Sequence, residues 1–126
     1  MELIDTHCHL DVPEFDADRD AVLARARAAG VAGLVIPAIQ RAGWPRLLEF
    51  CASAPGLFPA LGLHPVYLDG HDDGDVAALE TAVADRRPLA VGEIGLDYFV
   101  RDLDLGRQQV LFESQLAIAR SANLPV

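Results

Sequence analysis

The hydrophobic residues of the chain are grouped into short apolar runs separated by segments of helical periodicity. The apolar runs predict strands, and they cover residues 3–9, 31–37, 57–63 and 89–94. A continuous apolar run of this kind is typical of a strand that is covered on both faces. Residues 124–126 resemble the start of a fifth strand.

Each apolar run is followed by a segment with helical spacing of its apolar residues. The expected helices lie near residues 16–29, 43–54, 76–83 and 105–122. Gly30, Pro55-Gly56 and Asn123 are typical helix stop signals. The last helix is predicted to carry Phe112, Leu116 and Ala119 on one apolar side, and the acidic segment before the third helix is expected to cap it. Four strand–helix repeats predict a parallel sheet with helices outside it.

Two α/β architectures fit this order, a doubly wound sheet and half of an eight-stranded β/α barrel. No Gly-x-Gly-x-x-Gly follows the first strand, which disfavours a dinucleotide-binding fold. Polar residues lie at or just past the carboxyl ends of the predicted strands, namely His7, His9, His64 and Glu93. The carboxyl ends of barrel strands converge on one mouth. We therefore predict the first half of a (β/α)8 TIM barrel, with about four βα units.

Composition and charge exclude several functions. The chain has 126 residues, 52% of them hydrophobic, which fits one globular domain rather than a disordered segment. All 10 basic residues are Arg, so Schiff-base or phosphate-loop lysine chemistry is excluded within the chain. The net charge of -9 argues against broad capture of nucleic acid by a basic surface, although bound metal ions can supply positive charge locally.

The sequence also indicates a cytoplasmic location with no membrane partner. No apolar run is long enough to span a bilayer, and Glu2 directly after Met1 is unlike a signal peptide. Cys8 and Cys51 have neither disulfide-type nor zinc-type spacing, which favours reduced thiols.

The first candidate site is the His-x-His at the end of the first apolar run. If residues 3–9 are extended, His7 and His9 point to one face and Cys8 to the other. Two imidazoles at the carboxyl end of a strand can hold one divalent metal, although such histidines also occur as ordinary polar residues. Glu93 follows another strand, where a carboxylate is costly unless it is exposed, paired or bound to a cation. Its two oxygens can bridge two metals that promote attack on a phosphodiester.

Three further residues are candidates for the same mouth. His64 can hold a substrate phosphate or move a proton, and the alternative is a local turn histidine before Pro65. We do not predict it to be a metal ligand. Asp97 and Tyr98 can steady the site or contact substrate, and the alternative is that they only form the turn after the fourth strand.

Three ordered motifs together resemble the TatD family of metal-dependent hydrolases. They are Asp5-Thr6-His7-Cys8-His9-Leu10-Asp11, Gly62-Leu63-His64-Pro65 and Gly92-Glu93-Ile94-Gly95-Leu96-Asp97-Tyr98. Residues 108–126 are similar to that family as well. The resemblance implies a β/α barrel with a divalent-metal site, usually with two metals, and many members are deoxyribonucleases, including 3′-to-5′ exonucleases. It implies that His7 and His9 bind one metal, that Glu93 ligates or bridges two, and it leaves Mg, Mn and Zn open.

A complete member of that family is longer and carries two further histidine ligands and an aspartate after later strands. The resemblance therefore implies that residues 1–126 are a single partial barrel domain, truncated at the start of the fifth strand, with catalytic roles for Glu93 and His64 in the parent enzyme. The expected activity is metal-dependent hydrolysis of phosphodiester bonds, at DNA ends.

Two alternatives remain open. One is a hydrolase of small amides, lactones or esters on the same scaffold, since a fold does not fix the substrate. The acidic net charge favours this alternative over a DNA substrate. The other is a non-catalytic half barrel that self-associates, since exposed inward-facing strands and two open sheet edges invite pairing with another copy.

Overall fold

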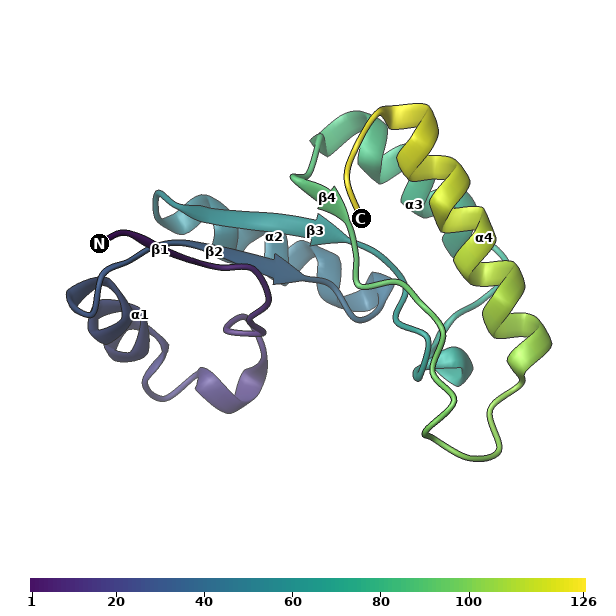
Figure 1. Cartoon of the computed structure of the whole chain (residues 1–126), viewed down its shortest axis with the longest axis horizontal. Helices are drawn as coiled ribbons and strands as arrows, with labels where there is room; N and C mark the ends of the chain where they lie inside the picture. The colour runs from purple at the N-terminus through teal and green to yellow at the C-terminus, as the bar shows by residue number, and fades with distance from the viewer.

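Four parallel strands form one sheet in the order β1-β2-β3-β4 (Figure 1). The computed structural model describes residues 1–126. The strands are β1 (Leu3–Asp5), β2 (Val31–Pro37), β3 (Leu57–Leu61) and β4 (Ala90–Val91). Each strand pairs in parallel with the next one in sequence, so each connection crosses over the sheet. This confirms the predicted parallel sheet.

Helices follow each strand and cover the sheet (Figure 1). They are α1 (Arg19–Ala28), α2 (Trp44–Ser53), α3 (Asp75–Arg86) and α4 (Leu105–Ala122). Gly30 and Asn123 follow the ends of α1 and α4 with φ of 95° and 54°, a left-handed conformation that glycine and asparagine adopt more readily than other residues. At the start of α3 the Asp75 carboxylate accepts the backbone N–H of Asp72 at 3.1 Å.

The strands are shorter than their apolar runs predict. β1 ends at Asp5, whose Oδ1 accepts the His7 backbone N–H at 3.0 Å and starts a turn. The expectation that His7 and His9 lie on an extended strand is therefore wrong, because they follow it. Residues 124–126 form no strand, although the Pro125 carbonyl accepts the backbone N–H of Val91 at 3.0 Å beside β4.

The hydrophobic core lies between the sheet and α2, α3 and α4. Its largest fully buried apolar side chains are Leu10, Ile36, Leu47, Leu61, Leu63, Leu79 and Val91. The prediction that every strand is covered on both faces is wrong for β1, where Leu3 and Ile4 are 42% and 59% exposed. No helix of the structure combines the length and the apolar character that crossing a membrane requires.

The buried face of α4 is only partly the predicted one, because Ala119 is buried at 2% exposed but Leu116 is not. Leu116 is 36% exposed, whereas Gln108 and Gln115 are each 1% exposed and lie among Leu111 and Ile118. Apolar periodicity fails here because both glutamines replace water with backbone partners in distant loops, so their amides are buried at little cost.

Candidate metal centre

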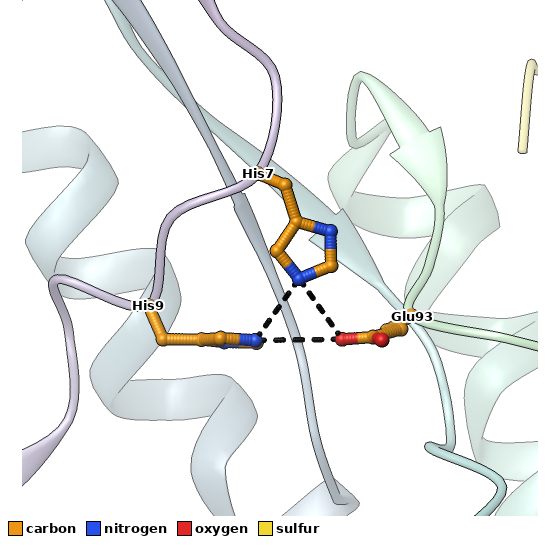
Figure 2. Close-up of side chains that lie close together, drawn as sticks. All are labelled: His7, His9 and Glu93. Atoms are coloured by element: carbon orange, nitrogen blue, oxygen red, sulfur yellow. Dashed lines mark hydrogen bonds and ion pairs between the residues drawn. The ribbon is translucent and has the colours of Figure 1, made fainter.

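Three ligand-type side chains meet beyond the ends of β1 and β4 (Figure 2). His7 Nε2 and His9 Nε2 lie 3.2 Å apart. Glu93 Oε2 lies 3.2 Å from His7 Nε2 and 3.4 Å from His9 Nε2. His7 and His9 reach this point from the segment after β1, and Glu93 reaches it from the chain after β4. The intervening Cys8 packs against the core.

The arrangement directs several electron pairs at one point. Glu93 Oε2 has no hydrogen-bond partner, and neither has the buried Nδ1 of His9. If His9 carries its proton on Nδ1, its Nε2 lone pair joins the carboxylate in facing a common point. Such lone pairs repel unless a proton or a cation lies between them.

The spacing fits a transition-metal or zinc site. Zn–N and Zn–O bonds of about 2.0–2.1 Å in a tetrahedral site place neighbouring ligand atoms about 3.3–3.4 Å apart. The distances between the three ligand atoms here are 3.2, 3.2 and 3.4 Å. Imidazole nitrogen and carboxylate oxygen are also suitable ligands for manganese and other divalent ions. The residues present therefore fit a divalent cation.

Glu93 is positioned by a close approach between the ends of β3 and β4. The Glu93 backbone N–H donates to the Ala38 carbonyl at 3.0 Å, and the Gly92 N–H donates to the Leu61 carbonyl at 2.9 Å. A Cβ at Gly62 would lie 2.6 Å from the carbonyl carbon of Gly92. Only glycine lets the two backbones approach this closely, so Gly62 helps to set the position of the Glu93 side chain.

His64 lies on the other side of the Glu93 carboxylate. Its Nε2 is 3.2 Å from Glu93 Oε1, and its Nδ1 accepts the Val66 backbone N–H at 3.1 Å. A backbone N–H can only donate, so neutral His64 carries its proton on Nε2 and donates toward Glu93. Burial lowers the pKa of the His64 imidazole, although the nearby Glu93 carboxylate acts to raise it. A protonated Nε2 cannot ligate a metal, but it can donate to a substrate oxygen.

Asp97 and Tyr98 lie in the loop before α4 and are not part of this cluster. Asp97 Oδ1 accepts the backbone N–H groups of Phe99 and Val100 at 3.0 and 2.8 Å, which makes it a turn-forming residue. Tyr98 is 72% exposed. The roles predicted for both residues in the site remain predictions.

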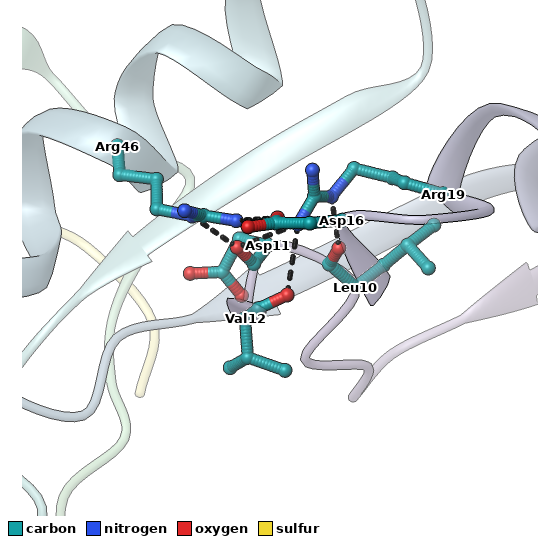
Figure 3. Close-up of polar contacts among 6 residues, drawn as sticks. All are labelled: Leu10, Asp11, Val12, Asp16, Arg19 and Arg46. Atoms are coloured by element: carbon teal, nitrogen blue, oxygen red, sulfur yellow. Dashed lines mark hydrogen bonds and ion pairs between the residues drawn. The ribbon is translucent and has the colours of Figure 1, made fainter. Parts of the chain in front are cut away.

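Two arginines hold the segment that follows His9 (Figure 3). Arg19 donates to the carbonyls of Leu10 and Val12 at 2.7 and 2.8 Å, and Arg46 donates to the Asp11 carbonyl at 2.6 Å. The Asp16 carboxylate lies between the two guanidinium groups and pairs with both. This arginine clamp ties the segment after His9 to α1 and α2, and sequence reasoning missed it because isolated Arg and Asp residues carry no motif.

We expect the arginine clamp to weaken in acid. Hydrogen bonds from Arg19, then from Arg46, hold the pKa of Asp16 below its usual range. A lowered pKa stabilises the folded state above the ordinary Asp pKa of about 3.9, and this contribution is lost as the pH falls through the lowered value. Asp16→Asn should therefore flatten the urea-unfolding stability curve below about pH 4, most visibly at low salt because the carboxylate is exposed.

Asp18→Asn is the matched control, because Asp18 faces only Arg25, at 3.7 Å. If Asp16→Asn and Asp18→Asn change the stability below about pH 4 equally, Asp16 has no special part in holding the segment after His9.

Comparison with known proteins agrees with this geometry. A family model described as "TatD related DNase" matches residues 4–126. The Escherichia coli K12 protein "Uncharacterized metal-dependent hydrolase YjjV" is 44% identical over 126 residues, which cover 98% of this chain and 48% of that protein. The human "Deoxyribonuclease TATDN3" is 37% identical over 138 residues, covering 98% of this chain and 50% of that protein.

Solved structures show the same fold. The crystal structure of the E. coli YjjV protein, described as a TatD homolog, superimposes with a TM-score of 0.93 at 43% identity, covering 98% of this chain and 49% of that one. A TatD-family hydrolase from Entamoeba histolytica superimposes with a TM-score of 0.83 at 19% identity, over 96% of this chain and 46% of that one. The chain spans about half the length of the relatives it matches. The predicted half of a TatD-type barrel is thereby confirmed.

Proposed function

The chain belongs to the TatD family, and from this premise we propose that its site serves divalent-metal-dependent hydrolysis of phosphodiester bonds. The observation that carries the proposal is the convergence of His7, His9 and Glu93 on one point, with Glu93 Oε2 lacking any hydrogen-bond donor. The names of its relatives, a metal-dependent hydrolase and a deoxyribonuclease, support the same reaction class.

In this proposal the residues of the chain have separate tasks. Neutral His7 and His9 would hold an ion through their Nε2 atoms, together with Glu93. A bound divalent ion supplies positive charge for the phosphoryl oxygens and lowers the pKa of bound water. His64, protonated on Nε2, would donate to a phosphate oxygen and help to orient the substrate.

We further propose two ions with Glu93 between them, in one barrel domain to which residues 1–126 belong. Support for two comes from the chemistry of a carboxylate, whose two oxygens can each bind one ion, and from Glu93 Oε2, which already faces His7 and His9. Any further ligands would lie outside these residues. Titration with Mn²⁺, followed by elemental analysis of the dialysed protein, would give the number of ions bound.

We propose DNA ends as the substrate. The net charge of -9 makes a broad electrostatic grip on DNA unfavourable, so binding would centre on metal-bound phosphate rather than on a basic surface. Attack at a chain end needs only such a local grip. Because the acidic charge disfavours DNA binding, small esters and lactones are the alternative substrates that the experiment must distinguish from DNA.

The test compares substrates under one set of metal conditions. The protein would be incubated with 3′- and 5′-end-labelled single-stranded DNA and with a panel of small esters and lactones, with Mg²⁺ or Mn²⁺ and with EDTA. We expect metal-dependent loss of nucleotides from the 3′ end. Hydrolysis of the small esters alone would contradict the DNA proposal, and no metal-dependent hydrolysis of any substrate would contradict the proposed function. Light scattering on the same samples would show whether the protein self-associates, for which the exposed β1 offers an open edge.

A further inference from the structure

The backbone of three consecutive residues, Leu63, His64 and Pro65, is held by buried side chains from other segments. Gln115 Oε1 accepts the Leu63 N–H at 2.7 Å, and Gln115 Nε2 donates to the Leu63 carbonyl at 3.2 Å. His71 Nε2 lies 2.9 Å from the His64 carbonyl oxygen. Because a carbonyl only accepts, this nitrogen carries the proton of neutral His71.

Gln108 connects this loop to the segment that follows Glu93. Its Nε2 donates to the Pro65 carbonyl at 3.1 Å, and its Oε1 accepts the Asp97 backbone N–H at 2.8 Å. One buried amide therefore links the loop after β3 to the loop after β4. Arg107, the neighbour of Gln108 on α4, donates to the backbone carbonyl of His71. His71 is therefore connected to the same helix as Gln108 and Gln115.

Burial makes these contacts more than surface hydrogen bonds. Gln108 and Gln115 are each 1% exposed and His71 is 5% exposed, so water cannot replace a lost partner. Each amide donates one hydrogen bond to a backbone carbonyl and accepts one from a backbone N–H. These directional contacts restrict the loop to essentially one position. The side chain that this loop presents to the metal centre is that of His64, with Nε2 3.2 Å from Glu93 Oε1.

We propose that Gln108, Gln115 and His71 are positioning residues that act through His64. They fix its backbone so that the imidazole faces Glu93 and the substrate phosphate rather than solvent. The proposal rests on the proposed function only for the role of His64 toward substrate, because the placement of the loop is a property of the metal-free fold. A misplacement of about 1 Å at a reacting centre can cost about a hundredfold in rate.

The experiment is a double-mutant cycle on metal-dependent hydrolysis. Gln108→Met and Gln115→Met keep the side-chain length and remove the amide, and each would be made with His64 present and in a His64→Ala background. Gln109→Met is the matched control, since Gln109 is exposed on the same helix and pairs only with Glu113. We expect kcat/KM to fall about 10- to 100-fold for the two buried sites when His64 is present, and less than about threefold when it is absent. Equal losses in both backgrounds would show a purely structural role and overturn the proposal.

A second variant keeps the test decisive if the methionine variants unfold. His71→Phe keeps a ring of similar size and removes the N–H that faces the His64 carbonyl. It costs no other side-chain hydrogen bond, because His71 Nδ1 has no partner, so it releases only the His64 loop. We expect it to lower kcat/KM with little change in the binding constant for Mn²⁺. A matching loss of Mn²⁺ affinity would mean that His71 acts on the metal ligands rather than on His64, which would also overturn the proposal.

An NMR measurement separates this inference from the proposed function. The ring signals of His64 in the metal-free protein should be single and sharp in the parent and in Gln109→Met, and broadened or doubled in Gln108→Met and Gln115→Met. If these signals change as expected while no phosphodiester is hydrolysed, the proposed function fails and the positioning stands. If they do not change, the positioning role is rejected whatever the activity.

Discussion

Replacing Glu93 with glutamine is expected to weaken divalent-metal binding by roughly a hundredfold or more and to lower metal-dependent hydrolysis on the order of a thousandfold. The change keeps the shape of the side chain and removes the negative charge that faces His7 and His9 at 3.2 and 3.4 Å. An amide is a poor ligand beside two neutral imidazoles, and its N–H₂ group can instead donate to one of them. The metal-free fold should therefore be as stable in the variant as in the parent, because a repulsive contact becomes a hydrogen bond.

Calorimetry with Mn²⁺ and the shift of the thermal unfolding midpoint on adding Mn²⁺ measure this effect directly. A ligand that binds only the folded state stabilises it by RT ln(1 + [L]/Kd), so at a Mn²⁺ concentration between the two dissociation constants the parent should respond and Glu93→Gln should not. Glu80→Gln, at an exposed position on α3, is the matched control. An unchanged Mn²⁺ response in Glu93→Gln would show that this carboxylate is not a ligand and would remove the main support for the metal centre.

The second large effect is expected from Gly62→Ala, which adds one methyl group where two backbones meet. The new Cβ would lie 2.6 Å from the Gly92 carbonyl carbon, 2.8 Å from its oxygen and 2.9 Å from the Glu93 nitrogen. These atoms belong to the backbone and cannot rotate away as a side chain could, so the end of β4 must move. We expect unfolding free energy to fall by about 1–3 kcal/mol and Mn²⁺ binding to weaken, because Glu93 moves with its backbone.

Urea denaturation and Mn²⁺ calorimetry on the same preparation test both parts of this result. Gly43→Ala is the matched control, because a Cβ at Gly43 meets no atom within 4 Å and its φ of -85° suits any residue. That variant should be neutral or slightly stabilising. If Gly62→Ala loses stability but binds Mn²⁺ as the parent does, then the close approach of β3 and β4 serves the fold and not the placement of Glu93.

The alternation of strands and helices was predictable because it depends on local periodicity. The second strand and the fourth helix match their predicted ranges, Val31–Pro37 and Leu105–Ala122. In both, the signal lies in residues that are neighbours in sequence: an unbroken apolar run for the strand and a long periodic segment ending at Asn123 for the helix. The lengths of the other strands were less predictable, because apolar residues continue beyond the point where hydrogen bonding to the next strand stops.

The grouping of the candidate ligands also followed from the sequence. Once four strands are parallel and consecutive, their carboxyl ends share one edge, and residues just after them must come near one another. This reasoning predicts that His7, His9, His64 and Glu93 gather at one edge. It does not predict the contacts among them. One example is the Val66 N–H bonded to His64 Nδ1, which leaves the proton of neutral His64 on Nε2, and such contacts depend on local turns that no motif specifies.

The sequence by itself determined the order of elements, the parallel sheet and the edge at which the chemistry gathers, because each depends on short-range pattern or on strand direction. Only the tertiary structure decided which face of α4 is buried, and why two glutamines lie on it. Gln115 finds its partner 52 residues away and Gln108 finds one 43 residues away. A buried amide is stable only when such distant hydrogen-bond partners are in place. The spacing of apolar residues along the helix therefore cannot predict that these two glutamines are buried.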